Sequence, residues 1–590
     1  MVAGNLSDFV RRKGLALCVC SILLSSTLII AMPRDGSVSL DMIERSHYSE
    51  GEDIWTDGGQ PWPQFGRSAG RLAEVPGHDP DSGGAGEDTP GNATSLMPVV
   101  DPKLNWAYGS YSIGTDALGT PIADFSNSLT VGEGAEQRCG GSSLYTILTQ
   151  TVETSGSDHS FLRIIEGEDA DLAWQVDLGV TDPIKSTPVI VDMDEDGLPE
   201  VIVVYDAGGS LYVEAWSPRL SCSVTGWSEN GHSAELVWSW SDDEKAIGSN
   251  EGPYTNTLLG GHKPTTQPLL ADVDLDGDAE LVLAAIDESS SSDEPVVLAL
   301  PLQVNGTPVT LWEVNLNKGS HPSDPAFVQL DDTTGHILLS TIEEQNGRVW
   351  VWKIESSTGD SIWDDGLDLQ NADGDTNSPH IRMPGPIIAN LDSDPSPEMI
   401  VTIPTDGDGS SAIDGAEFRG LEIDDGSEIW RFDAENGFAD APPTAIDTDG
   451  DSQHDRVCWV TWWQSSPPSA ARHGVAGCHD VDGANPDQAW SRDLEQSSGV
   501  PNDEIAVAAA SWMNINGVDE QELLVPFGRT LWAFDGDTGT SAGTNNEWAD
   551  GIDLDHRTWS SPSLADIDGD ATMDVVIGSM VVSTGMADVR

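Results

Sequence analysis

One pattern of apolar and acidic positions recurs along most of the chain. Each copy opens with a proline and a short apolar run, continues with acids at alternate positions, and closes with a longer apolar run. The clearest copies are "STPVIVDMDEDGLPEVIVV", "TQPLLADVDLDGDAELVLAA", "GPIIANLDSDPSPEMIVT", "APPTAIDTDGDSQHDRVCWV" and "SPSLADIDGDATMDVVIGS". Short apolar runs bounded by turn residues indicate buried strands, so each copy predicts two strands joined by an acidic turn.

The copies can be counted from their first residues. Six copies, including the weaker "DPAFVQLDDTTGHILLS", begin with a proline at Pro188, Pro268, Pro325, Pro386, Pro443 and Pro562. Proline suits the first residue of a strand, which need not donate to the sheet. Two degenerate copies begin near Pro121 and Ala508, which gives eight starts. A supersecondary unit repeated at regular spacing indicates a propeller or solenoid, in which each unit buries its apolar face against its neighbours.

Tryptophans mark the far end of each repeat. A further short strand is expected at Trp174, Trp240, Trp312, Trp363, Trp430, Trp490 and Trp548, each ring packing between neighbouring repeats. The last repeat lacks such a strand, but "KLNWAYG" at 103–109 supplies Trp106 before the first start. We therefore predict an all-β fold: an eight-bladed β-propeller of four-stranded antiparallel blades, closed by the N-terminal strand. A seven-bladed ring is the alternative, because the unit at Pro121 is poorly formed.

The N-terminal part has a different composition. Arg11, Arg12 and Lys13 precede an uncharged apolar stretch at 14–32, which predicts a hydrophobic helix acting as a signal peptide or a membrane anchor. Residues 34–100 are rich in Gly, Asp, Ser and Pro and predict a flexible spacer. The predicted division is thus 1–33, 34–100 and a propeller at 101–590. The propeller is expected outside the cell or on its surface, where 14–32 could hold it to the membrane.

The acidic turns share one spacing. Counting the first acid or amide as position 1, five turns carry oxygen-bearing side chains at positions 1, 3, 5 and 9. The residues are Asp192, Asp194, Asp196 and Glu200; Asp272, Asp274, Asp276 and Glu280; Asn390, Asp392, Asp394 and Glu398; Asp447, Asp449, Asp451 and Asp455; and Asp566, Asp568, Asp570 and Asp574. Two further turns, "QLDDTTG" and "WMNINGVDE", depart from the pattern and are expected to bind no metal.

This spacing suits calcium. Ca²⁺ takes roughly six to eight oxygen ligands, and an Asp-rich loop with a glycine bend turns alternate side chains towards one point. The sequence therefore predicts about five structural Ca²⁺ sites, with the listed side chains as ligands. The formal net charge of −74 agrees with cation binding and excludes a basic nucleic-acid surface.

The repeated D-x-D-x-D-G-x-x-[DE] turn followed by an apolar strand resembles the FG-GAP repeats of integrin α-subunit propellers and of bacterial VCBS-type surface proteins. This resemblance covers 121–590 and implies the same calcium ligands. The Phe-Gly and Gly-Ala-Pro dipeptides of that family are not kept. "WKIESSTGDSIW" and "LEIDDGSEIW" are similar to the tryptophan-docking motif of quinoprotein-like propellers, which supports the count of eight blades.

Catalytic signatures are few. The vicinal cysteine pair typical of the quinoprotein dehydrogenases is missing, as are a G-x-S-x-G elbow and zinc spacings among the histidines. Outside 14–32 the cysteines are Cys139, Cys222, Cys458 and Cys478, and the last two lie on predicted neighbouring strands that favour a disulfide.

The favoured function is a monomeric, calcium-rigidified binding or adhesion scaffold for a protein or glycan ligand. The alternative is a propeller-type polysaccharide lyase, or another extracellular enzyme, that uses the axial pocket.

Overall fold

The computed structural model of the protein describes β-strands and turns in the unit Tyr48–Arg590. The described residues are 108–110, 112–114, 117, 119–123, 144–154, 157–167, 172–181, 184–193, 199–219, 233–247, 266–289, 294–302, 309–331, 333–343, 348–369, 383–392, 396–405, 415–434, 437–448, 453–464, 472–483, 485–494, 509–513, 521–542, 548, 551–554, 557–567, 574–581 and 586–589. The predicted segments 1–33 and 34–100 lie outside them, as do Trp106, Cys139 and Cys222. Within these ranges, no helix is long and apolar enough to cross a membrane.

The strands form antiparallel sheets that follow one another along the chain. Sheet 1 contains β2 (Ser112–Gly114), β3 (Ile122–Ala123), β4 (Tyr145–Thr154), β5 (Ser157–Glu166) and β6 (Leu172–Asp177). Sheet 2 contains β7 (Val189–Val191), β8 (Glu200–Ala207), β9 (Ser210–Arg219) and β10 (Ser233–Asp242). Sheet 3 contains β11 (Lys245–Ala246), β12 (Leu269–Ala271), β13 (Glu280–Asp287), β14 (Glu294–Pro301) and β15 (Trp312–Asn315).

The next three sheets repeat this order. Sheet 4 contains β16 (His321–Pro322), β17 (Ala326–Asp331), β18 (Thr334–Glu343), β19 (Arg348–Glu355) and β20 (Leu367–Leu369). Sheet 5 contains β21 (Ile387–Ala389), β22 (Glu398–Thr405), β23 (Gly415–Glu422) and β24 (Glu428–Asp433). Sheet 6 contains β25 (Thr444–Ile446), β26 (Arg456–Gln464), β27 (Arg472–Asp480) and β28 (Asp487–Leu494).

The C-terminal sheets are smaller. Sheet 7 contains β29 (Ser511–Met513), β30 (Glu522–Phe527), β31 (Thr530–Asp535) and β32 (Ile552–Asp553). Sheet 8 contains β33 (Ser563–Ala565) and β34 (Asp574–Val576), and sheet 9 contains β1 (Tyr108–Ser110), β36 (Met586–Val589) and β35 (Gly578–Val581). All seven prolines named as repeat starts directly precede the first strand of their hairpin, as predicted: Pro121, Pro188, Pro268, Pro325, Pro386, Pro443 and Pro562.

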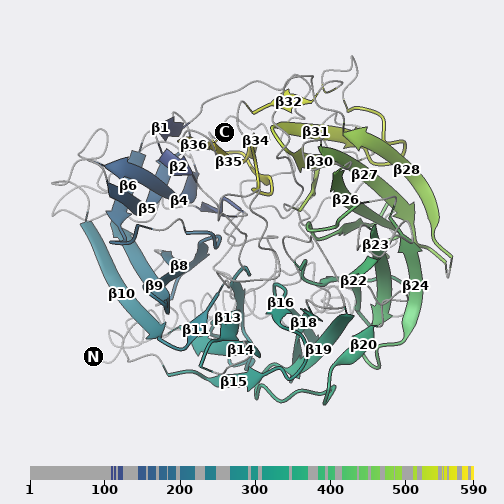
Figure 1. Cartoon of the computed structure of the whole chain (residues 1–590), viewed down its shortest axis with the longest axis horizontal. Helices are drawn as coiled ribbons and strands as arrows, with labels where there is room; N and C mark the ends of the chain where they lie inside the picture. Colours follow the sequence, from purple (N-terminus) through teal and green to yellow (C-terminus); the bar gives the residue numbers. More distant parts are fainter. Residues whose placement is uncertain are drawn as a thin grey trace, which may run out of the picture. The chain divides into compact units, whose positions relative to one another are not determined.

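The hydrophobic core is divided among the seams between successive sheets. Residues of sheets 1 and 2 share one buried cluster, and the same holds for each following pair up to sheets 6 and 7. A seventh cluster joins sheets 7 and 8 to sheet 1, so the succession closes on itself. Figure 1 shows the resulting ring, with β10, β15, β24 and β28 at its rim. The fold is an all-β propeller, because each sheet buries both faces only by packing between two neighbours.

The first and last strands that the structure describes lie in one sheet. The N-terminal strand β1 pairs antiparallel with β36, with Tyr108 opposite Val589 and Ser110 opposite Ala587. Main-chain hydrogen bonds thus join the first and last described strands. Most of the predicted strand at 103–109, with Trp106, lies outside the described residues, so its role in completing the last repeat stays a prediction.

The tryptophans of the repeats pack as predicted in most sheets. Trp174, Trp312, Trp430, Trp490 and Trp548 are buried. Trp240 and Trp363 are half-buried. The prediction that each lies in a short outer strand is wrong for Trp363 and Trp548, which precede β20 and β32. Positive-φ glycines in these segments, at Gly366 and Gly551, start the outer strand only after the tryptophan.

Cys458 on β26 and Cys478 on β27 are directly opposite each other and form a disulfide, as their predicted strands favoured. Both residues are buried in the seam between sheets 6 and 7, beside Trp490. The bridge links neighbouring strands of one sheet and therefore fixes their register.

His336 on β18 gives the fold a pH-dependent stability. Burial, reinforced by the nearby Lys353 ammonium, lowers the pKa of this imidazole from 6.5 to about 4. Between these values the unfolded chain binds the proton and the folded chain does not, so the free energy of unfolding falls as the pH falls. The loss is roughly 3 kcal/mol once the pH is below 4, and the contribution is unaffected above pH 6.5.

We expect His336→Gln to remove this component. In denaturant unfolding at a series of pH values, the wild type should lose roughly 3 kcal/mol more stability than the variant as the pH falls from 6.5 to 4. Parallel curves would contradict the prediction. Because the difference between the two proteins is compared, titration of the many carboxylates in both cancels.

Candidate metal centre

The five acidic turns join the first two strands of their hairpins and are named after their sheets. They are acid loop 2 (192–200), acid loop 3 (272–280), acid loop 5 (390–398), acid loop 6 (447–455) and acid loop 8 (566–574). Acid loop 3 is described in full. Of the predicted ligands in the other loops, the structure describes Asp192, Glu200, Asn390, Asp392, Glu398, Asp447, Asp455, Asp566 and Asp574, whereas Asp194, Asp196, Asp394, Asp449, Asp451, Asp568 and Asp570 lie outside the described residues.

Acid loop 3 separates its apolar and acidic side chains by alternation. Val273 is fully buried in the core shared by sheets 3 and 4, and Leu275 packs against the same cluster. Asp272, Asp274 and Asp276, at the alternate positions, each offer one carboxylate oxygen, and these oxygens lie within 4.8 Å of one another. The alternation explains how an acidic turn can lie directly on a hydrophobic core.

The backbone of acid loop 3 bends around Asp272. Leu275 and Gly277 both have positive φ, at 60° and 100°. This left-handed conformation is unfavourable for leucine, and burial of its side chain against the core offsets the cost. The bend directs the amides of Asp276 and Gly277 to the two carboxylate oxygens of Asp272, at 3.1 and 3.0 Å. The acid at position 1 is therefore held in place by the loop's own backbone.

The acid at position 9 has a role that the sequence analysis missed. Glu280 Oε2 accepts a hydrogen bond from the Val273 N–H at 3.0 Å, from position 2 of the same loop. All five loops make this bond, the donor and acceptor residues being Met193 and Glu200, Leu391 and Glu398, Thr448 and Asp455, and Ile567 and Asp574. Glu280 is not in the group of three converging aspartates. The position-9 carboxylate thus closes the turn through one oxygen.

The loop concentrates negative charge in a poorly solvated place. Burial raises the pKa of Glu280 to about 8, and the three neighbouring aspartates add to the shift. Burial also raises the pKa of Asp272 and of Asp274, the latter further raised by the charge of Asp276. Asp274 Oδ1 is inaccessible to solvent and accepts no hydrogen bond. A bound divalent cation would supply the missing partner and favour the ionised carboxylates.

Hydrogen bonds also join neighbouring sheets across a seam, from a tryptophan of one sheet to a glycine-containing turn of the next. The Trp312 indole N–H donates to Ser356 O at 2.6 Å, and that of Trp490 to Gly536 O at 2.7 Å, each across a seam. The rings lie against Gly359 and Gly539, both at positive φ, where a Cβ would come within 2.8 and 2.4 Å of the ring. These contacts place the two tryptophans between neighbouring sheets, as the sequence predicted.

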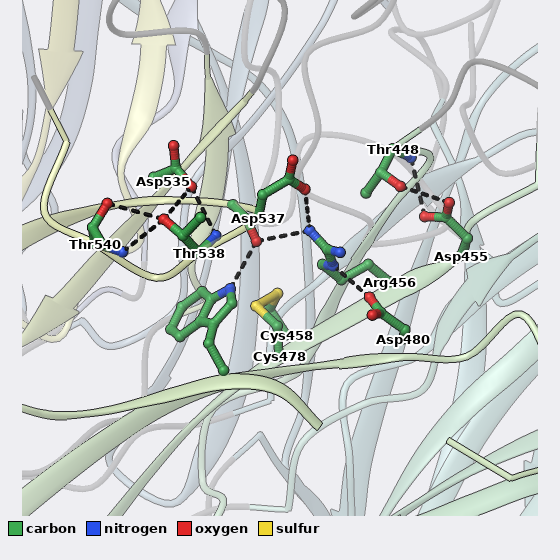
Figure 2. Close-up of polar contacts among 12 residues, drawn as sticks. Thr448, Asp455, Arg456, Cys458, Cys478, Asp480, Asp535, Asp537, Thr538 and Thr540 are labelled. Carbon is green, nitrogen blue, oxygen red and sulfur yellow. Dashed lines mark hydrogen bonds and ion pairs between the residues drawn. A yellow bond between two sulfur atoms is a disulfide. The ribbon is translucent and has the colours of Figure 1, made fainter. Parts of the chain in front are cut away.

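Figure 2 shows the seam between sheets 6 and 7. Arg456, next in sequence to Asp455, extends between Asp480 of its own sheet and Asp537 of the next, at 2.7 and 2.5 Å. The same guanidinium donates to Gly536 O at 2.9 Å. Thr448 bonds Asp455 through both its N–H and its hydroxyl, at 3.0 and 2.6 Å. The acid loop and the seam are thus adjacent.

Comparison with known proteins gives similarity in fold only. No family model matches the chain, and no curated protein matches it. Similar solved structures include the Dos1 propeller, with 10% identity, a TM-score of 0.37 and coverage of 84% of this chain and 95% of that one. The exotype rhamnogalacturonan lyase YesX has 14% identity, a TM-score of 0.42 and coverage of 84% and 75%. Sqt1 of Chaetomium thermophilum has 9% identity, a TM-score of 0.41 and coverage of 81% and 97%.

At these scores the similarity says nothing about what the chain binds or does. The resemblance to FG-GAP and quinoprotein-like repeats stays a prediction, since it rests on the sequence motifs alone. The residues of the acid loops and the seams next to them are therefore the features of the molecule that bear on its function.

Proposed function

We propose that the protein is an exported, calcium-binding β-propeller that serves as a rigid binding scaffold for a protein or glycan ligand. The observation that carries the proposal is the convergence of Asp272, Asp274 and Asp276 in acid loop 3, with one buried oxygen of Asp274 unpartnered. The shared spacing and the shared closing bond extend the proposal to the other four loops. Calcium is structural here, and adhesion to a partner surface is the biological role.

The donor set fits calcium. Oxygens on one Ca²⁺ lie about 2.3–2.6 Å from the ion, so any two of them are at most about 5 Å apart. The three aspartate oxygens of acid loop 3 meet this limit, at 4.8 Å or less. A carbonyl near position 7 and the second carboxylate oxygen of Glu280, Oε1, would add ligands. Mg²⁺ fits less well, because it seldom gives up its waters to an all-protein site.

The proposed ring has eight blades and is monomeric. Sheets 8 and 9 are consecutive in the chain, since Ile577 alone separates β34 from β35. If β34 and β35 form one continuous strand, the two sheets make a single four-stranded blade with β33 innermost and β1 outermost. Two observations support this count: a buried cluster contains residues of sheets 7, 8 and 1, and β1 pairs with β36.

Export is supported by two independent features. The apolar stretch at 14–32 follows a basic cluster, as in signal peptides and membrane anchors. The disulfide between Cys458 and Cys478 is of a kind that persists in oxidising compartments and is rare in the cytosol. We therefore place the propeller outside the cell, either released or held to the membrane by the N-terminal segment.

Metal analysis of the purified exported domain tests the calcium sites. We expect about five Ca²⁺ per chain after dialysis against calcium buffer, and a preparation that takes up none would contradict the proposal. A glycan and protein binding array, run with and without chelator, tests the scaffold. Incubation with acidic polysaccharides is the parallel assay: turnover to shortened products would replace the scaffold by a lyase.

A further inference from the structure

We infer that Ser356 of sheet 4 positions the calcium site of sheet 3, so that each ion also fastens the neighbouring blade. This inference rests on the proposed function and adds a residue to it that lies outside the acid loops. Ser356 is far from acid loop 3 in the sequence, and no metal-binding pattern contains it. The inference follows from three hydrogen bonds that cross or border the seam.

Ser356 touches the loop at its most constrained point. Its hydroxyl donates to Val273 O at 2.6 Å, and Val273 lies between the ligand candidates Asp272 and Asp274. The Val273 N–H is already bonded to Glu280. Both main-chain polar groups of position 2 are therefore fixed, one by the loop's own acid and one by the next sheet. Rotation of either flanking peptide would move Asp272 or Asp274.

Ser356 itself is held rigidly. It is fully buried, and its N–H donates to Gly335 O of its own sheet at 3.0 Å. Its carbonyl accepts the indole N–H of Trp312, which belongs to sheet 3. Because its N–H, its carbonyl and its hydroxyl all have partners, the hydroxyl can hold Val273 O in only a narrow range of positions.

Other acid loops are fastened to the next sheet at equivalent carbonyls. In acid loop 5, the His454 N–H donates to Asn390 O at 2.6 Å, and Gln453 Nε2 donates to Leu391 O at 3.2 Å. In acid loop 8, the Leu144 N–H of sheet 1 donates to Ile567 O at 2.9 Å. The carbonyls belong to position 1 or position 2 each time, although the donors differ. The fastening is therefore a feature of the ring and is not confined to one seam.

Calcium binding to acid loop 3 and the hydrogen bond from Ser356 to Val273 O must then favour each other. A cation that fixes Asp272 and Asp274 also fixes Val273 O, which strengthens the bond from Ser356. By thermodynamic linkage, loss of the Ser356 hydroxyl must weaken the ion's affinity by the same factor by which the ion strengthens the bond. If the bond reaches its full strength only when the ion is bound, its loss corresponds to roughly a fivefold weakening of the ion's affinity.

Calcium titration of variants tests the inference. Ser356→Ala should weaken one of the sites about fivefold, whereas the control Ser357→Ala, an exposed neighbour, should bind as the wild type does. Asp274→Asn removes the same site directly, so the double variant Asp274→Asn/Ser356→Ala should lose no further binding. Terbium luminescence excited through tryptophan reports the same titration spectroscopically.

Two outcomes would overturn the inference in distinguishable ways. If Ser356→Ala destabilises the protein equally with calcium and with chelator and leaves every affinity unchanged, the residue is merely structural and the calcium proposal survives. If the wild type binds no calcium at all, the proposed function fails and the inference with it.

Hydrogen exchange of the wild type gives a measurement that needs no stable Ser356 variant. Calcium should slow exchange in peptides that span 353–363 of sheet 4 as well as in those that span acid loop 3. Asp274→Asn should abolish both effects. Protection confined to acid loop 3 would contradict the coupling.

Discussion

Removal of calcium is expected to lower the melting temperature of the propeller on the order of 10 °C. A site saturated a hundredfold above its dissociation constant contributes about 2.7 kcal/mol, and five sites act together. The entropy of unfolding of a domain this large is about 1 kcal/mol per degree, which converts that sum into the stated shift. Differential scanning calorimetry in calcium and in chelator measures it. Identical transitions would rule out structural calcium.

Acid loop 3 provides a matched pair of variants for this prediction. Asp274→Asn should remove about a fifth of the calcium-dependent shift, because one of five sites is lost. In chelator the same variant should be as stable as the wild type or more so, since it removes a half-buried negative charge and its repulsion with Asp276. Asp278→Asn is the control: it removes an exposed carboxylate of the same loop that lies outside the converging group. If both variants lose the same part of the calcium-dependent shift in melting temperature, the effect is one of general charge and not of a bound ion.

At the contact between Gly539 and Trp490, a single added methyl group is expected to have a large effect on stability. Gly539→Ala would place a Cβ 2.4 Å from the indole of Trp490 while φ is +61°, so the ring must move. We expect destabilisation of roughly 2–4 kcal/mol, from the conformational strain plus the overlap. Gly179→Ala is the matched control, because φ is +72° there and nothing lies within 4 Å. It should cost about 1 kcal/mol, the strain alone.

The variant Trp490→Ala separates the conformational strain at Gly539→Ala from the overlap with the ring. Deleting the ring should cost about 3–5 kcal/mol, through the lost burial and the lost bond to Gly536 O. In that background Gly539→Ala should cost only about 1 kcal/mol, as at Gly179, because no ring remains to be displaced. Denaturant unfolding of the wild type, the two single variants and the double variant completes a double-mutant cycle. Additive effects would show that the glycine is needed for some reason other than the ring.

Much of the fold follows from patterns that are local in sequence. The apolar runs gave β8, β13, β22 and β26 because a strand buried on both faces must be apolar at nearly every position. A proline precedes the first strand of these hairpins, because a residue at the start of a strand need not donate a main-chain hydrogen bond to the sheet. The outer strands were predicted to include Trp363 and Trp548 but begin after them. Gly366 and Gly551 form turns between each tryptophan and its strand, and the tryptophan alone does not indicate such a turn.

The candidate site divides differently. The carboxylates at positions 1, 3 and 5 could be found from spacing alone, because alternation in a turn directs them to one side. The hydrogen bond from the position-2 amide to the position-9 carboxylate could not be found from the sequence. An acidic side chain is expected at position 9 both for a metal ligand and for an acceptor of a main-chain hydrogen bond, so the residue type does not distinguish the two roles. A signal was available at position 2, which is apolar in four of the five loops: Val273, Leu391 and Ile567 are buried in the seam cores, and Met193 packs against one.

The sequence by itself determined which residues form strands, where the acidic turns fall and that the repeats must pack side by side. Those properties depend on the chemistry of residues near one another in the chain. Tertiary structure alone decided that Arg456 pairs with Asp537 and that Ser356 holds Val273. Such partners come from different repeats, and only the closure of the ring brings their atoms within hydrogen-bond distance.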